Sequence, residues 1–270
     1  MKIAIIGYGK MGKMVEQAAR EQGHTVTAIV EPLSQESNPP PGAPSGAKMF
    51  QGIAEAGDLC GAEAAIEFTQ PGTALANIKA LADKKIPSVI GTTGWYDQID
   101  EARRAVEQSG AALIWASNFS LGVNIFYRIA WYAAQLADSF PEYDVGGFES
   151  HHNKKLDSPS GTAKTLVEGT LARIKRKDKV VWETLDRRPQ SNELHFPSLR
   201  LGSVPGQHSL LFDSPADTIE ITHTARSREG FASGAVRAAQ WLLNSAAAGS
   251  RTGFFSIDDM MKDILDISGM

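Results

Sequence analysis

The chain has 270 residues, of which 42% are hydrophobic and 21% charged, and its formal net charge is −4. An acidic chain of this composition argues against a nucleic-acid or an anionic-membrane surface as partner, and a single cysteine, Cys60, excludes an internal disulfide and fits a reducing compartment. With no apolar stretch of about eighteen residues to predict a membrane span, we expect a soluble cytoplasmic protein, long enough for two domains.

Strands alternate with helices in the first part of the chain. The apolar run 2–6 is typical of a strand buried on both faces, and a glycine-rich link leads from it to a helix predicted over 14–22. Further strands are expected at 25–30, 64–68, 88–90 and 111–115, with helices at 73–83 and 96–108. This alternation predicts a parallel sheet with right-handed crossovers. The proline-rich stretch 32–46 predicts a long loop whose role the sequence does not indicate.

The pattern changes after Asn118. A long helix is predicted over 123–140, and strands follow at 144–150, 193–201, 208–212 and 217–226, with one clear helix, 160–174, between them. Consecutive strands predict a mixed or antiparallel sheet, and hence a second, α+β domain. Helices at 231–247 and 257–267 are expected to return to the first domain. The predicted domains are therefore 1–120 with 231–270, for dinucleotide binding, and 121–230, for substrate binding and oligomerisation; segment 175–191 has no recognisable pattern.

The glycine-rich link has the spacing of a dinucleotide-binding loop. Gly7-x-Gly9-x-x-Gly12 follows a strand and opens a helix, so that Gly7 allows the turn, Gly9 the approach of a pyrophosphate, and Gly12 helix–strand packing. Glu31, at the end of the second strand, stands where an acidic residue accepts hydrogen bonds from the adenosine ribose. Its charge disfavours a 2′-phosphate, but Lys10 in the loop offsets this. NADH and NADPH therefore both stay open as cofactors.

Two more loops follow strands at the edge where parallel sheets bind ligands. They are Gly-Thr-Thr-Gly at 91–94 and Ala-Ser-Asn-Phe at 116–119. Small and hydroxylated residues suit a slot for the nicotinamide, although each loop alone is equally an ordinary link between a strand and a helix. The predicted cofactor-binding residues are Gly7, Tyr8, Gly9, Lys10, Met11, Gly12, Glu31, Gly91, Thr92, Thr93, Ala116, Ser117, Asn118 and Phe119.

The segment 149–163, E-S-H-H-N-K-K-L-D-S-P-S-G-T-A, concentrates groups that bind anions and move protons. Ser160 is a good helix N-cap, so the amides of Gly161, Thr162 and Ala163 would be free to bind a carboxylate or a phosphate. His151 and His152 exchange protons near neutral pH, and two lysines add positive charge. Each part alone is more often a solvated surface or a simple cap; together they predict an anion site with a proton source.

A metal site is not expected. The chain has six histidines and one cysteine, but neither H-x-x-x-H nor C-x-x-C spacing occurs, and adjacent histidines do not easily point at one ion. Three other histidines, His195, His208 and His223, fall in strand-like runs and are interpreted as structural.

In their order along the chain, G-Y-G-K-M-G, G-T-T-G, A-S-N-F-S-x-G-V-N and the 149–163 segment resemble the dihydrodipicolinate reductase family of the bacterial lysine pathway. The later I-T-H-T-A-R-S-R-E-G-F-A-S-G-A-V-R-A-A resembles the family's segment before its closing helix. The glycine loop departs from the common G-x-x-G-R-M-G form: it is one residue shorter, with Lys10 where arginine is usual, which leaves the coenzyme preference open.

The resemblance implies an NAD(P)H-dependent reductase of 4-hydroxy-tetrahydrodipicolinate, or of its dehydrated form, in lysine and diaminopimelate biosynthesis. It implies that His151 and Lys155 are catalytic and handle the proton, and that His152, Gly161 and Thr162 bind the small cyclic dicarboxylate. Lys154 is then a solvated neighbour. The alternatives are another two-domain dehydrogenase of amino-acid metabolism and a catalytically silent NAD(P)-binding sensor.

The resemblance also implies a homotetramer assembled through the sheet of the second domain. Apolar residues of the strands there, Val204, Leu210, Leu211 and Phe212, are expected to be available to face a partner.

Overall fold

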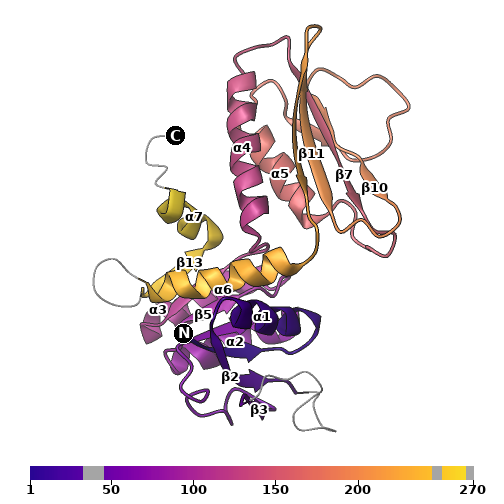
Figure 1. The fold of residues 1–270 in the computed structure, drawn as a ribbon. Helices are drawn as coiled ribbons and strands as arrows, with labels where there is room; N and C mark the ends of the chain where they lie inside the picture. The colour runs from indigo at the N-terminus through magenta and orange to yellow at the C-terminus, as the bar shows by residue number, and fades with distance from the viewer. Residues whose placement is uncertain (33–45, 245–250, 266–270) are drawn as a thin grey trace. The chain divides into compact units, whose positions relative to one another are not determined.

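The computed structural model of the chain describes residues 1–32, 46–244 and 251–265 (Figure 1). Two compact units make up the chain: Met1–Ser120 with Glu229–Met270, and Leu121–Arg228. We call them unit 1 and unit 2. Of the helices described, none is both long and apolar enough to span a bilayer.

Unit 1 contains a seven-stranded sheet in the order β13-β6-β5-β4-β1-β2-β3, in which every neighbouring pair is parallel. Its strands are β1 (Lys2–Ile6), β2 (Thr25–Val30), β3 (Lys48–Phe50), β4 (Ala64–Glu67), β5 (Ser88–Ile90), β6 (Ala112–Trp115) and β13 (Gly253–Ser256). Its helices are α1 (Lys10–Glu21), α2 (Pro71–Asp83), α3 (Ile99–Ser109), α6 (Glu229–Leu243) and α7 (Ile257–Leu265), and a short 3₁₀ turn (Tyr96–Gln98) precedes α3.

The strand order reverses between β1 and β4, as it does in a doubly wound dinucleotide-binding sheet. Helix α1 connects β1 to β2 and helix α2 connects β4 to β5, and these connections run toward opposite edges of the sheet. Because such crossovers are right-handed, the two helices cover opposite faces of the sheet. Helix α1 packs against α6, and α2 packs against α3. The predicted Rossmann-type fold is therefore confirmed, and the loops after β1 and β4 flank the crevice where ligands bind in this architecture.

Two strands of unit 1 were not expected from the sequence. β3 is only three residues long, and β13 joins the opposite edge of the sheet by pairing with β6. Edge strands this short carry too few residues to show a strand periodicity. The proline-rich residues 33–45 and the last positions of the two closing predicted helices, 245–247 and 266–267, lie outside the described residues.

Unit 2 contains a four-stranded sheet in the order β10-β7-β11-β12, with β7 and β10 parallel and the other pairs antiparallel. The sheet is therefore mixed. The strands are β7 (Asp144–His151), β10 (Ser198–Arg200), β11 (Gln207–Asp213) and β12 (Thr218–Thr224); β8 (Lys179–Val181) and β9 (Glu193–His195) form a separate pair. Helices α4 (Leu121–Ala137) and α5 (Gly161–Leu171) pack together, and their apolar faces share one core with Val145, Leu194, Leu210 and Phe212.

The expectation of one strand over 193–201 is wrong. Residues Glu193–His195 pair with β8, whereas Ser198–Arg200 pair with β7 in the other sheet. Pro197 lies at the change, where it lacks an N–H for a ladder but its carbonyl accepts the N–H of Glu149 at 3.1 Å. The proline thus ends one pairing and begins another.

Candidate functional site

The loop after β1 is packed closely enough to require glycine at two of its three motif positions. Gly7 has φ +89°, and a Cβ there would lie 2.2 Å from the carbonyl oxygen of Phe68. A Cβ on Gly12 would lie 2.1 Å from the carbonyl oxygen of Gly7. A Cβ on Gly9, in contrast, would meet no atom within 4 Å. Gly7 and Gly12 are therefore needed by the protein's own packing, while the open space at Gly9 fits the approach of a pyrophosphate.

Glu31 lies beside this loop. Its Oε2 accepts a hydrogen bond from the backbone N–H of Tyr8 at 2.7 Å. The Tyr8 hydroxyl donates instead to the buried Glu16, and burial together with that bond raises the pKa of Tyr8. Gly9 caps α1 without a side-chain bond, and Lys10 and Met11 are the first two residues of that helix. An acidic group beside a glycine loop and a helix N-terminus fits a dinucleotide.

The loops after β1, β4 and β5 converge on Phe68. A Cβ on Gly91 would lie 2.1 Å from the Phe68 ring, whose own carbonyl contacts Gly7. Thr92 is buried, and its hydroxyl accepts the backbone N–H of Thr69 at 2.7 Å, whereas Thr93 is exposed. The structure therefore brings the predicted 91–94 loop next to the glycine loop.

The predicted residues 116–119 follow β6 in the same sheet. Ala116 and Phe119 are buried and Ser117 is exposed, while the Asn118 Oδ1 accepts the backbone N–H of Ser120 at 2.8 Å. A polar amide held at the end of a parallel strand suits ligand recognition, but only Ser117 and Asn118 present side chains that are not buried.

β4 ends with a buried carboxyl group, that of Glu67, which no sequence motif had indicated. Glu67 is fully buried, and its Oε1 accepts hydrogen bonds from the Thr69 hydroxyl and from the Asn77 amide, at 3.3 Å for the latter. Its Oε2 has no hydrogen-bond partner among the described residues. Burial raises the pKa of Glu67, against the opposing effect of the hydrogen bonds from Thr69, Thr92 and Asn77.

Glu67→Gln is therefore expected to stabilise unit 1 at neutral pH. Because the folded state raises the pKa of this carboxyl, the wild type loses stability as pH rises from the unfolded value of about 4.3 through the folded one. Glutamine imitates the neutral acid and does not titrate. Urea denaturation between pH 4 and pH 8 should show the variant gaining on the wild type as pH rises; a constant difference across that range would contradict the prediction.

In unit 2 the expected helix cap is confirmed. Ser160 is the N-cap of α5, and its side chain accepts the backbone N–H of Ala163 at 3.1 Å. The expectation that the Ala163 amide is free is therefore wrong, because the cap itself takes that donor. Gly161 is exposed, and a Cβ there would meet no atom within 4 Å. Thr162 is half-buried, and its carbonyl accepts the Tyr127 hydroxyl at 3.2 Å. The first turn of α5 thus has room in front of it for an anion.

His151 ends β7 next to this helix start, within a buried cluster. Its Nδ1 lies 3.3 Å from Oε2 of Glu149, and its ring meets the His208 ring edge-to-face with centroids 5.2 Å apart. His208 Nε2 is 3.1 Å from the Ser160 hydroxyl, which links the cluster to the helix cap. All four side chains are buried. Burial lowers the pKa of His208, and the facing Glu149 only partly opposes this, so His208 is neutral near pH 7.

Lys155 and His152 lie in the loop between β7 and α5. The Lys155 ammonium forms an ion pair with Asp157 at 2.8 Å. Burial is the main cause of the low pKa of His208, and the positive charge of Lys155 lowers that pKa further. His152 is half-buried, and its Nδ1 has no hydrogen-bond partner among the described residues. Lys154 is exposed, as expected of a solvated neighbour.

Three participants in this cluster were not anticipated: Glu149, His208, and Arg200, whose guanidinium donates to the Glu149 carboxylate at 3.1 Å. His208 was interpreted as structural, yet the β7–β11 register pairs it directly with Glu149. The pairing depends on the topology of the sheet, and the spacing of these residues along the sequence does not indicate it. A signal did exist for Glu149, because positions two apart on a strand share a face, which aligns Glu149 with His151.

Ligand atoms of Glu149, His151 and His208 lie within 4.8 Å of one another, as in a candidate metal site. However, the Glu149 carboxylate accepts hydrogen bonds from Ser160, Ser198 and the Arg200 guanidinium, and a cation placed there would face that guanidinium. These N–H and O–H donors already stabilise the charge of the Glu149 carboxylate, and we assign no metal to the cluster.

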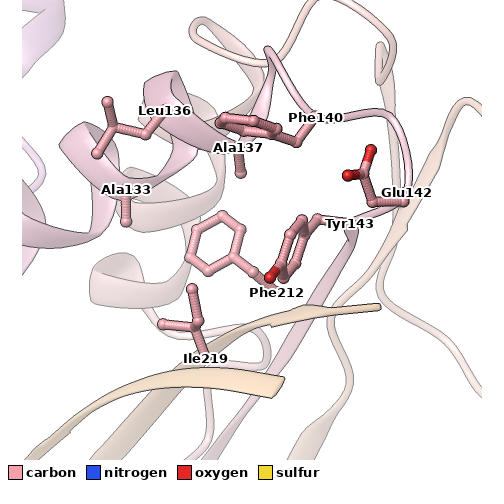
Figure 2. A pocket seen from close by; sticks show the side chains of 8 residues that line it. All are labelled: Ala133, Leu136, Ala137, Phe140, Glu142, Tyr143, Phe212 and Ile219. Atoms are coloured by element: carbon pink, nitrogen blue, oxygen red, sulfur yellow. The ribbon is translucent and has the colours of Figure 1, made fainter. Parts of the chain in front are cut away.

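A separate hollow of about 390 Å³ lies at the opposite end of the same strands, where β7 begins. Figure 2 shows the rings of Tyr143 and Phe212 between α4 and Ile219 of β12. Glu142 provides the only carboxylate among its lining residues. With an apolar lining and no converging polar groups, this hollow is not the reaction site.

Comparison with known proteins relates both parts of the chain to the same family. Residues 1–119 match the family described as dihydrodipicolinate reductase, N-terminus, and residues 122–261 match dihydrodipicolinate reductase, C-terminus. The chain belongs to the dihydrodipicolinate reductase family. The resemblance inferred from the motifs is thereby confirmed. Family membership makes the chain an NAD(P)H-dependent oxidoreductase, and neither the other dehydrogenase types nor the silent sensor is favoured.

Relatives of this family match nearly the full chain. The 4-hydroxy-tetrahydrodipicolinate reductase of Christiangramia forsetii is 37% identical over 266 residues, which cover 98% of this chain and 99% of the relative. That of Staphylococcus aureus (strain bovine RF122 / ET3-1) is 32% identical over 264 residues, or 96% and 100% of the two chains.

Solved structures show the same fold. A dipicolinate-bound dihydrodipicolinate reductase from Paenisporosarcina sp. TG-14 has a TM-score of 0.75 at 20% identity and covers 95% of this chain and 97% of its own. An amine dehydrogenase from Mycobacterium smegmatis has a TM-score of 0.62 at 11% identity and covers 96% and 95%. At these identities the likeness establishes the fold alone.

Proposed function

We propose that this chain reduces 4-hydroxy-tetrahydrodipicolinate, or its dehydrated form dihydrodipicolinate, to tetrahydrodipicolinate in lysine and diaminopimelate biosynthesis. The observation that carries the proposal is the buried His151–Glu149 pair beside the open N-terminus of α5. A proton source next to an anion site is what a conjugated cyclic imine with two carboxylates requires.

The roles of the residues follow from this chemistry. The amides of Gly161 and Thr162, with His152, bind a carboxylate of the substrate at the start of α5. A bound nicotinamide would supply the hydride that a ring carbon gains, and His151, with Lys155, supplies the proton that the neighbouring centre gains. The dehydrated substrate, NAD(P)H and one proton thus give tetrahydrodipicolinate and NAD(P)⁺; the hydroxylated form additionally loses water. Negative charge that develops on the ring is stabilised by the nearby cations.

The cofactor is proposed to bind in unit 1, with its pyrophosphate at Gly9 and the first turn of α1 and its adenosine ribose at Glu31. The loops 91–93 and 116–119 are proposed to bind the nicotinamide half. Open space at Gly9 and the bond between Glu31 and the Tyr8 N–H support this assignment. Because Tyr8 turns its side chain to Glu16, only its backbone is proposed to contact the cofactor.

Steady-state assays with NADH and NADPH in parallel test the reaction and the coenzyme together. We expect the wild type to oxidise both in the presence of the condensation product of aspartate semialdehyde and pyruvate. A chain that binds NADH without oxidising it would instead be a silent sensor. Oxidation of an amino or hydroxy acid with NAD(P)⁺ would point to another dehydrogenase.

Glu31→Gln is expected to shift the preference toward NADPH. Glutamine keeps an oxygen for the Tyr8 N–H but removes a repulsion with the 2′-phosphate of about 1 kcal/mol, which corresponds to a change of about five-fold. The ratio of kcat/KM values for the two coenzymes measures this. An unchanged ratio would show that the ribose does not lie at Glu31.

A cytoplasmic homotetramer, formed through the unit 2 sheet, is also proposed. β12 is an edge strand of that sheet, and its Ile219 side chain is 51% exposed. Of the residues expected to face a partner, Leu210 and Phe212 cannot do so, because they are buried in the unit 2 core. Light scattering of the purified chain measures the assembly.

A further inference from the structure

The two oxygens of the Glu149 carboxylate have different surroundings. Oε1 accepts three hydrogen bonds: from the Ser160 backbone N–H at 3.0 Å, from the Ser198 hydroxyl at 2.7 Å and from the Arg200 guanidinium at 3.1 Å. These donors come from the α5 cap and from β10, and the Glu149 side chain is fully buried. Oε1 is therefore anchored from two directions, which fixes the plane of the carboxylate.

Oε2 faces only the two histidines. It lies 3.3 Å from Nδ1 of His151 and 3.4 Å from Nε2 of His208, and neither approach meets hydrogen-bond geometry. A buried carboxylate oxygen needs compensation for its desolvation, and the N–H groups of these two imidazoles lie close enough to supply it. The surrounding groups have a clear net effect: burial would raise the pKa of Glu149, but His151, His208, Ser160 and Ser198 together lower it far below the usual range. Glu149 is thus ionised at every working pH.

We propose that Glu149 is a positioning residue for the reduction: its Oε2 fixes His151 as the Nδ1–H tautomer, so that Nε2 is the nitrogen that exchanges the proton with the substrate. This inference rests on the proposed function for the identity of the reaction. A carboxylate behind an imidazole orients the ring and stabilises the imidazolium without taking its proton, as in other carboxylate–histidine pairs.

The proton inventory is consistent with this arrangement. Charged His151 has Nδ1–H directed at Glu149 and Nε2–H available for donation; after donation it keeps the Nδ1–H. Nε2 lies against Gly206, where an added Cβ would be 3.0 Å away, so glycine leaves space beside this nitrogen. His208 is neutral and places its Nε2–H toward Glu149 and the Ser160 hydroxyl. The two histidines therefore have opposite tautomers.

Other charges around His151 do not replace Glu149. Arg200, on β10, is directed at Oε1 of Glu149 and at the Asp157 carbonyl, which it reaches at 2.6 Å. Lys155 is paired with the Asp157 carboxylate. His208, on β11, is neutral. Among the groups of the described residues that these interactions place around His151, Glu149 is the carboxylate in contact with its ring.

Glu149→Gln tests the proposal. We expect kcat to fall about 10- to 100-fold, the size of the loss seen when the carboxylate behind a metal-ligating histidine is mutated, with a much smaller change in KM. The high-pH fall of kcat/KM, which reports loss of the acid's proton, should begin at lower pH in the variant. Glu149→Asp keeps the charge and should restore part of both.

Glu193→Gln is the matched control. Glu193 is another buried carboxylate of unit 2, held by Arg187 and Lys179, and within the described part of the chain no interaction connects it with a histidine ring. It should lower stability but leave the pH profile unmoved. If both variants shift the profile equally, or if Glu149→Gln leaves it unchanged, the positioning role is overturned. Wild type that does not turn over would instead reject the proposed reaction.

A measurement on the wild type avoids any folding defect of the variants. Ring ¹⁵N chemical shifts of the full-length chain, followed from pH 5 to pH 9, should show neutral His151 protonated at Nδ1 and neutral His208 protonated at Nε2. This readout needs neither substrate nor turnover. Finding neutral His151 protonated at Nε2 would overturn the proposal, whatever the kinetics of the variants.

Discussion

Replacing His151 by Gln together with Lys155 by Ala is expected to lower kcat by about 10³-fold or more, because a positioned general acid alone contributes about 10²- to 10⁴-fold. His151 is buried beside an ionised carboxylate, and Lys155 provides a cation in the adjoining loop. In the proposed mechanism the variant loses both the proton source and the charge that stabilises the developing anion. Initial rates of NADH oxidation at saturating substrate measure the effect, and NADH binding should be retained.

Lys154→Ala is the control for this double variant. Lys154 has the same charge and is adjacent in sequence, but it is exposed, so its removal should change kcat less than about two-fold because surface charges contribute little. Turnover that survives in the double variant would reject the assignment of the proton step to this segment. Equal losses in the double variant and the control would mean that general positive charge, and not His151, is what matters.

The local features of the candidate site were predictable because their causes are local. Ser160 caps α5 as its residue type predicts, and the glycine loop follows β1 as the motif spacing predicts. The cap and the loop are each determined by a few consecutive residues. The parallel sheet was predictable for a different reason: strands that alternate with helices leave parallel pairing with right-handed crossovers as the favoured arrangement.

Features that depend on pairing between distant strands were not predictable. His208 lies 57 positions after His151 and meets it only because β11 runs antiparallel to β7, with His208 opposite Glu149. Arg200 reaches Glu149 because β10 leaves the direction of β9 at Pro197. One sequence has no internal signal for such a register, because strand pairing is set by the packing of the whole sheet.

The glycine loop offers the second large expected effect. In Gly12→Ala, the new Cβ would lie 2.1 Å from the Gly7 carbonyl oxygen, so α1 and the loop must separate. Because the contact is with backbone and cannot be relieved by a rotamer, we expect a loss of about 3 kcal/mol in the free energy of unfolding, at the upper end of overpacking. Urea denaturation measures this loss, and NADH binding should fall with it.

Gly9→Ala separates packing from cofactor binding. Gly9 has φ −71°, which alanine adopts freely, and its Cβ would meet no protein atom within 4 Å. The variant should fold with a stability loss below about 1 kcal/mol, since alanine is only a poorer N-cap than glycine. NADH should nevertheless bind at least about ten-fold more weakly, because the methyl group occupies the space proposed for the pyrophosphate. If Gly9→Ala binds NADH normally while Gly12→Ala is destabilised, the packing of the loop is as described but the pyrophosphate lies elsewhere. If Gly12→Ala is as stable as the wild type, the close approach of Gly7 and Gly12 is itself wrong.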